Sequence, residues 1–369
     1  DNCAIQDLQI SQSSFDCSDL GNQTLTFTAL DVNGNQRSTQ VGITVLDTVS
    51  PIVPGGSFNL NLDANGAASL SAADINGNAS DNCGVTSWTL SQTSFSCADV
   101  GSNTVSLTAT DASGNSQTTN YTILVQDALA PVLNLQNITV YLTANGMRAV
   151  AATEVDNVSS DNCAIASRVL DIDTFDCADL GQNLVNFTAT DVNGNAASQN
   201  VIITVKDTIS PSIVNLPTNI TAYTDPNQCG TIVQWPAILG SDNCGSATVS
   251  TSQTNGGLFA KGLTNVNVLV QDANGNSQSG SFTINVLDTI APLISNVPQV
   301  YTVLPNAGSC DAGVNWIPPV ASDNCGTANL TSNYAPGATL PVGTTTIVYT
   351  ATDADGNSRS VSFDVTVTD

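Results

Sequence analysis

The chain has 369 residues, 31 acidic residues against 6 basic ones, a net charge of -25 and no histidine. Without histidine it lacks the usual general base and the commonest transition-metal ligand, so Ser-His-Asp catalysis, histidine zinc sites and haem ligation are excluded in this segment. Six basic residues cannot line a phosphate backbone, which argues against nucleic-acid binding, and an anionic membrane surface should repel the chain.

Three motifs recur in register along the chain. Asp-Asn-Cys begins at residues 1, 81, 161, 242 and 323, a period of 80 or 81 residues. Asp-x-x-Gly-Asn and an Asp-x-x-x-Pro junction keep the same period, which predicts a tandem repeat architecture. Since the prolines mark the joints, we define repeats 1 to 5 as residues 1–50, 51–130, 131–210, 211–291 and 292–369. Repeat 1 lacks its opening half, and we interpret the chain as a segment of a longer array.

Each repeat is predicted to consist of short strands. Apolar residues stand two, four and six positions before every Asp-x-x-Gly-Asn, as in Val105, Leu107 and Ala109, and this alternation is typical of a strand with one buried face. The following run alternates too, so the glycine-containing motif should close a hairpin. In repeats 2 and 3, Asp63–Gly66 and Thr143–Gly146 should close a second hairpin.

The fold class follows from these strands. About seven short strands in 80 residues, without helical periodicity, predict an all-β chain. We expect a tandem array of immunoglobulin-like β-sandwich domains that forms an elongated rod. Trp88, Trp235 and Trp316 lie in strand-like surroundings and should pack in the core rather than form sugar-binding platforms.

The ten cysteines fall in five close pairs without any Cys-x-x-Cys, so zinc ribbons are disfavoured. Because each repeat carries two cysteines, we predict that all bridges form within repeats, in an oxidising compartment. A loop of about 15 residues closed in this way is stabilised by roughly 3 kcal/mol. The predicted disulfides are Cys3–Cys17, Cys83–Cys97, Cys163–Cys177, Cys229–Cys244 and Cys310–Cys325.

Half of the aspartates occupy three positions per repeat. In a sandwich whose strands alternate in direction, the Asp-Asn-Cys loop and the Asp-x-x-Gly-Asn turn should both face the junction Asp of the preceding repeat. Three carboxylates with loop carbonyls would suit Ca²⁺, which takes 6 to 8 oxygen ligands. The alternative is that each Asp only caps its own turn. The four predicted sets are Asp47/Asp81/Asp111, Asp127/Asp161/Asp191, Asp207/Asp242/Asp272 and Asp288/Asp323/Asp353.

The motifs together resemble a known family. Asp-Asn-Cys, Thr-Ala-Thr-Asp-x-x-Gly-Asn and Val-x-Val-x-Asp resemble the hyalin-repeat (HYR) family, and also the tandem repeats of large surface adhesins of gliding, type IX-secreting bacteria. Repeats 4 and 5 match best, with Cys229 and Cys310 upstream of Asp-Asn-Cys, whereas repeats 1 to 3 carry that cysteine 14 residues downstream. The resemblance implies an extracellular module at the cell surface, used for adhesion or display, and no catalytic activity.

Two functions remain open at this stage. The first is a non-catalytic stalk or fibre of a cell-surface adhesin or filament, which displays or connects binding regions. Its partners would be neighbouring repeats of the same chain and other copies in a fibre, without nucleic acid or membrane insertion. The second is a set of glycan- or protein-binding modules appended to a secreted protein.

Overall fold

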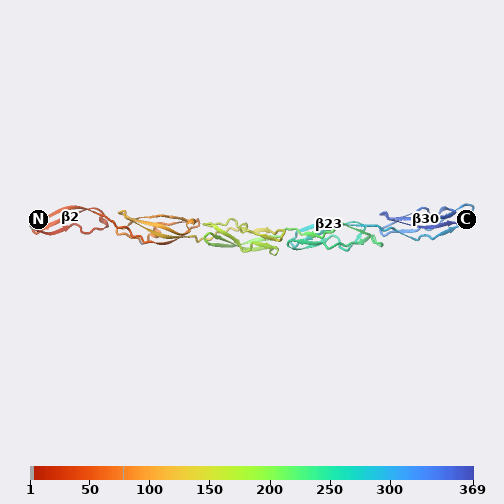
Figure 1. Cartoon of the computed structure of the whole chain (residues 1–369), viewed down its shortest axis with the longest axis horizontal. Helices are drawn as coiled ribbons and strands as arrows, with labels where there is room; N and C mark the ends of the chain where they lie inside the picture. Colours follow the sequence, from red (N-terminus) through yellow and green to blue (C-terminus); the bar gives the residue numbers. More distant parts are fainter. Residues whose placement is uncertain (1–3, 78) are drawn as a thin grey trace. The chain divides into compact units, whose positions relative to one another are not determined.

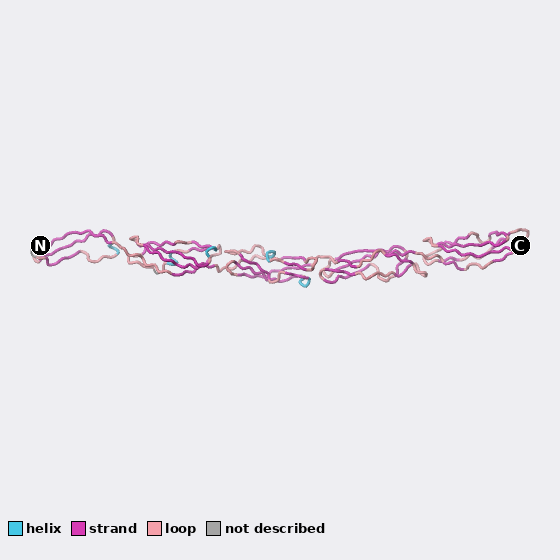
Figure 2. Tube along the Cα trace, in the orientation of Figure 1, coloured by secondary structure: helices cyan, strands magenta, loops and turns pink. Residues whose placement is uncertain are grey.

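The computed structural model describes residues 4–77 and 79–369. Strands dominate it, and the helices are single turns (Figure 2). None of the described helices is long and apolar enough to cross a membrane. The chain divides into two compact units: residues 1–139, 149–174 and 182–204 form unit 1, and residues 140–148, 175–181 and 205–369 form unit 2. Figure 1 labels β2 in the first unit and β23 and β30 in the second.

In unit 1, repeat 1 is a single antiparallel sheet in the order β1-β2-β3. Its strands are β1 (Ile5–Ile10), β2 (Gly21–Asp31) and β3 (Gln36–Val45), with a 3-10 turn at Cys17–Asp19. Leu25 is buried, but Leu8 is 62% exposed and Val41 is 42% exposed. Within the described residues this sheet has no second layer, so part of its apolar face meets solvent.

Repeat 2, also in unit 1, is a two-layer sandwich. Its larger sheet has the order β4-β9-β8-β6 and its smaller sheet pairs β5 with β7. The two layers enclose a core that contains Leu70, Phe95, Val105, Leu107 and Ile123. The elements are β4 (Gly56–Asn61), β5 (Ala67–Ser69), α1 (Ala72–Ile75), β6 (Val85–Leu90), β7 (Ser94–Ser96), η2 (Cys97–Asp99), β8 (Gly101–Asp111) and β9 (Ser116–Gln126).

Repeat 3 has the same elements. They are β10 (Ile138–Tyr141), β11 (Met147–Ala149), α2 (Ala152–Val155), β12 (Ile165–Leu170), β13 (Thr174–Asp176), η3 (Cys177–Asp179), β14 (Gly181–Asp191) and β15 (Ala196–Lys206). Val185, Phe187 and Ala189 of β14 are fully buried, as their alternation predicts.

In unit 2, repeats 4 and 5 are sandwiches with aromatic cores. Trp235 packs edge-on against Phe259 and Phe282, and the indole N–H of Trp316 donates to the Tyr349 hydroxyl at 2.8 Å. Repeat 4 contains β16 (Ser212–Val214), β17 (Ile220–Tyr223), β18 (Gly230–Ile232), β19 (Leu239–Asp242), β20 (Gly245–Thr251), β21 (Leu258–Ala260), β22 (Gly262–Gln271) and β23 (Ser277–Leu287). Repeat 5 contains β24 (Leu293–Ser295), β25 (Tyr301–Val303), β26 (Asp311–Val314), β27 (Val320–Ser322), β28 (Asn329–Ser332), β29 (Ala338–Pro341), β30 (Gly343–Thr352) and β31 (Ser358–Val367).

The predicted all-β tandem fold is confirmed, and so is the hairpin at Asp-x-x-Gly-Asn, where β8 pairs with β9, β22 with β23 and β30 with β31. The predicted second hairpin is wrong. Asp63–Gly66 does form a tight turn, in which the Gly66 N–H donates to the Asp63 carbonyl. However, β4 then pairs in parallel with β9 while β5 pairs with β7, so the two flanking strands belong to different layers.

Candidate functional site: the joints between repeats

Each disulfide joins two consecutive repeats. The bridges are Cys17–Cys83, Cys97–Cys163, Cys177–Cys244 and Cys229–Cys325, with Cα atoms 5.3, 5.3, 5.3 and 4.5 Å apart. The predicted pairs within repeats are therefore wrong. Cys310 is an exposed free thiol, and Cys3 lies outside the described residues.

Strand direction explains why the predicted pairs cannot form. Cys83 lies at the end of the sandwich where β6 begins, because Val85 pairs with Asp111, the last residue of β8. Cys97 follows β7 and precedes Gly101, the first residue of β8. The 11 residues of β8 therefore separate the two cysteines by about 30 Å. A disulfide needs Cα atoms within about 7 Å.

The upstream cysteine of repeat 4 reaches the same end of its sandwich by another route. Cys229 precedes β18, and its carbonyl accepts from the Lys261 N–H, next to Gly262 at the start of β22. Gln271, the last residue of β22, pairs with Thr248 near Cys244. The two cysteine positions, so different in sequence, both bridge to the next Asp-Asn-Cys.

The asparagine of Asp-Asn-Cys holds each bridged joint together. The amide of Asn162 donates to the carbonyl of Asp63 at 3.3 Å and to the carboxylate of Asp127 at 3.0 Å, both in repeat 2. Asn243 repeats this with the Thr143 carbonyl and the Asp207 carboxylate. The sequence analysis did not assign these asparagines a role, although their fixed place beside the cysteine was a signal.

A glycine lets the two repeats approach closely. Gly66 has a φ of +72°, and a Cβ there would lie 2.5 Å from the Asn162 carbonyl oxygen and 2.7 Å from Cys97 Sγ. Gly146 has a φ of +71°, and a Cβ there would lie 2.8 Å from the Asn243 carbonyl oxygen. No side chain fits between the hairpin of one repeat and the cysteine loop of the next.

The structure brings three of the four predicted aspartate sets together. Carboxylate oxygens in each set lie within 4.8 Å of one another: Asp47/Asp81/Asp111, Asp127/Asp161/Asp191 and Asp207/Asp242/Asp272. The fourth group differs, because it consists of Asp288, Asp353 and Asp355 and leaves out Asp323. Asp355 is the third residue of its turn, where the other joints have Ser113, Asn193 and Asn274.

The junction aspartates are fixed through their main chain. The Asn195 amide donates to the Asp127 carbonyl at 3.2 Å, and Asn357 does the same to Asp288 at 3.1 Å. The Asp127 carboxylate receives a second donor from Asn193 at 2.8 Å. At the fourth joint Asp355 cannot donate, and its carboxylate pairs with Lys261, whose pKa is raised first by that hydrogen bond.

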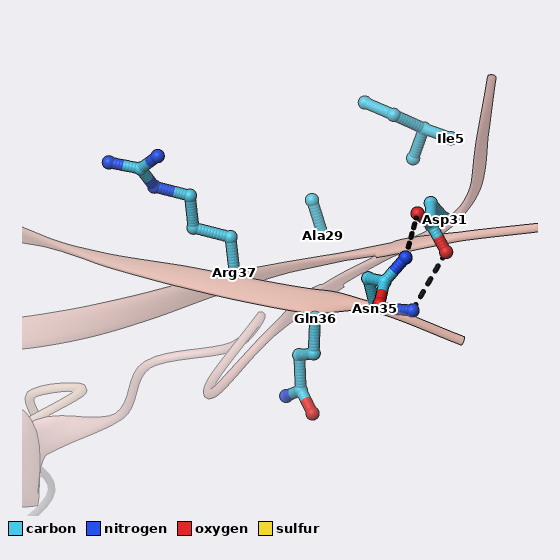
Figure 3. Close-up of a pocket in the computed structure, with 6 residues that line it drawn as sticks. All are labelled: Ile5, Ala29, Asp31, Asn35, Gln36 and Arg37. Atoms are coloured by element: carbon cyan, nitrogen blue, oxygen red, sulfur yellow. Dashed lines mark hydrogen bonds between the residues drawn. The ribbon is translucent and has the colours of Figure 1, made fainter. Parts of the chain in front are cut away.

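The turn aspartates are already satisfied. In repeat 1, Asp31 accepts from the backbone and the side chain of Asn35 (Figure 3). The side-chain bond, followed by the backbone bond, lowers the pKa of Asp31 below 3.8. Burial alone would raise the pKa of Asp111 and Asp191, but the corresponding Asn side-chain and backbone bonds outweigh it and lower both. These carboxylates are charged at neutral pH even though they are buried.

Other oxygens at the joints are buried without any hydrogen-bond partner. They include Asp81 Oδ1, Asp161 Oδ1, Asp242 Oδ1, Asp288 Oδ2 and Asp323 Oδ1, as well as the amide oxygens of Asn162, Asn243 and Asn324. Leaving such a group unpaired costs about 1–3 kcal/mol, and more when it is charged. The donors at the joints are all oxygen, which is the chemistry that hard divalent cations take.

The fold and the joints define a tandem array of β-sandwich repeats stapled by disulfides. Residues 206–286 and 287–367 match the HYR domain model. The chain is 34% identical over 367 residues to a hyalin of Strongylocentrotus purpuratus, covering 94% of this chain and 30% of the relative. It is 30% identical over 364 residues to a hyalin of Lytechinus variegatus, covering 93% and 68%. The chain belongs to the hyalin-repeat family.

Two limits follow from these comparisons. The chain spans less than a third of the length of the first hyalin. A cadherin structure, protocadherin gamma B2 extracellular domains 1–5, covers 99% of this chain and 93% of its own at 14% identity, but its TM-score of 0.32 is too low to support an argument. The resemblance to adhesins of gliding bacteria stays a prediction.

Proposed function

We propose that the chain is a non-catalytic, extracellular segment of a cell-surface adhesin or filament and works as a stalk that displays or connects binding regions. The observation that carries this proposal is that all four disulfides connect one repeat to the next. Such bonds form and persist in oxidising compartments. They would also keep a load-bearing array from lengthening when a repeat unfolds.

The bridges shorten the covalent path that force can pull straight. In the oxidised chain this path runs to Cys17, from Cys83 to Cys97, from Cys163 to Cys177, back from Cys244 to Cys229 and on from Cys325. It includes about 100 residues, or about 370 Å when fully extended. The reduced chain should extend to about 1,300 Å.

Single-molecule force spectroscopy of the full chain tests this. We expect the oxidised chain to stop lengthening near 370 Å and the same chain in reductant to reach about 1,300 Å. Bridges within repeats would hide only short loops and leave a limit of about 1,100 Å. An oxidised chain that extends beyond 1,000 Å would overturn the stalk proposal.

A further inference from the structure

We propose that each of the four joints binds one Ca²⁺ between two repeats, through the groups Asp47/Asp81/Asp111, Asp127/Asp161/Asp191, Asp207/Asp242/Asp272 and Asp288/Asp353/Asp355. The proposal goes beyond the stalk function, because a binding module would need rigid joints as well. It also separates these aspartates from ordinary turn residues, which would be complete without an ion.

The first argument is the spacing of the oxygens. Ca²⁺ binds oxygens at 2.3–2.6 Å, so two ligands on opposite sides of one ion are up to about 5 Å apart. Carboxylate oxygens in each group lie within 4.8 Å of one another. Three negative charges at this separation repel one another, and a divalent cation between them would reverse the sign of the local interaction.

The second argument is independent of the clustering. Asp288 is only 6% exposed, and its Oδ2 has no hydrogen-bond partner although the residue belongs to the fourth group. At the second and third joints, Asp161 and Asp242 each use Oδ2 to accept from the cysteine N–H two residues on, while Oδ1 is buried and unpaired. A turn residue needs only the first of these bonds. The second oxygen is left for a ligand.

The third argument concerns which ion fits. Each group offers carboxylates without histidine or thiolate, and the amide oxygens of Asn162, Asn243 and Asn324 at the joints are unpaired as well. An all-oxygen set spread over two repeats suits Ca²⁺, which accepts 6 to 8 ligands in flexible geometry. Mg²⁺ demands near-ideal octahedral geometry at 2.0–2.1 Å and should bind more weakly.

The experiment is calcium titration of the full oxidised chain by calorimetry, up to 5 mM because extracellular sites commonly have dissociation constants of about 0.1–1 mM. We expect four Ca²⁺ per chain and a higher melting temperature with Ca²⁺ than with equal Mg²⁺. Asp111→Asn should reduce the stoichiometry to three. Absence of binding at 5 mM, or four ions bound to Asp111→Asn, would overturn the proposal.

Asp31→Asn is the matched control. Asp31 makes the same turn bonds as Asp111, to the backbone of the third and fifth turn residues and to the Asn side chain, but it belongs to none of the four groups. It should keep four ions. Equal loss of calcium in both variants would show that the ions respond only to net charge or turn folding, and would also overturn the proposal.

Discussion

At the scale of single residues, the joint depends on side chains that are too short or too polar to be recognised as an interface. Asn162 links the Asp63 carbonyl to the Asp127 carboxylate, and Asn195 fixes the Asp127 carbonyl. Gly66 leaves the space into which the Asn162 carbonyl fits. These contacts use small polar groups at fixed positions, so hydrophobic patterning does not reveal them.

Replacing Gly66 by alanine should destabilise the joint between repeats 2 and 3. An added Cβ at a φ of +72° would be strained and would also meet the Asn162 carbonyl oxygen at 2.5 Å. The strain costs about 1–2 kcal/mol, and the overpacking adds about 1–3 kcal/mol. Urea denaturation of the oxidised chain measures the loss.

Gly308→Ala provides the control for the overpacking. Gly308 has a φ of +83° in the corresponding hairpin of repeat 5, but a Cβ there would meet nothing within 4 Å. It should therefore cost only the strain. If the two variants lose the same stability, close approach of the repeats is not what selects glycine at position 66.

The Asp31 turn should lose stability in acid. Its folded pKa lies below 3.8, and the unfolded value is about 3.9, so the ionised carboxylate contributes stability above about pH 4. That contribution is lost as the pH falls through the folded pKa. Because the Asn35 side chain is the largest cause, Asn35→Ala should raise the pKa of Asp31, as measured by NMR titration of the carboxyl carbon.

Asn33→Ala distinguishes this cause from a general effect of the turn sequence. Asn33 donates to Asp31 through its backbone N–H, which alanine retains. The pKa of Asp31 should therefore stay low in this variant. A shift as large as that of Asn35→Ala would mean that the side-chain hydrogen bond does not set the pKa.

At the scale of strands, one argument about direction was applied to the aspartates and not to the cysteines. Alternating strands place Asp81 and Asp111 at the same end of repeat 2, and the structure brings them together. The same reasoning places Cys97 at the other end, beyond β7, where it meets Cys163. Counting cysteines per repeat favoured local pairs because it ignored the length of the sandwich.

The two layers also depend on pairing that the local sequence does not specify. A tight turn at Asp63–Gly66 is compatible with a hairpin or with strands that separate. The parallel pairing of β4 with β9 joins residues about 65 positions apart, and it leaves β5 for β7. Nonlocal hydrogen bonding therefore decided the layer to which each strand belongs.

At the scale of the whole molecule, we expect an extended particle in solution. Strands of 10 or 11 residues make one sandwich about 35 Å long, so five repeats in line measure on the order of 150–200 Å. A compact globule of 369 residues would have a radius of gyration of about 21 Å, whereas such a rod would have about 45–60 Å. Small-angle scattering distinguishes the two, and a value near 21 Å would exclude the rod.

The sequence by itself determined the period, the all-β class, the buried face of strands such as β8 and the convergence of three aspartate sets. These features depend on alternation and registered spacing, which are local and repeat in every copy. Only the tertiary structure decided the disulfide partners, the roles of Gly66 and Asn162, and the replacement of Asp323 by Asp355 in the fourth group. Each of these depends on which end of one sandwich meets the next, and residues that meet there are about 66 or more positions apart in the chain.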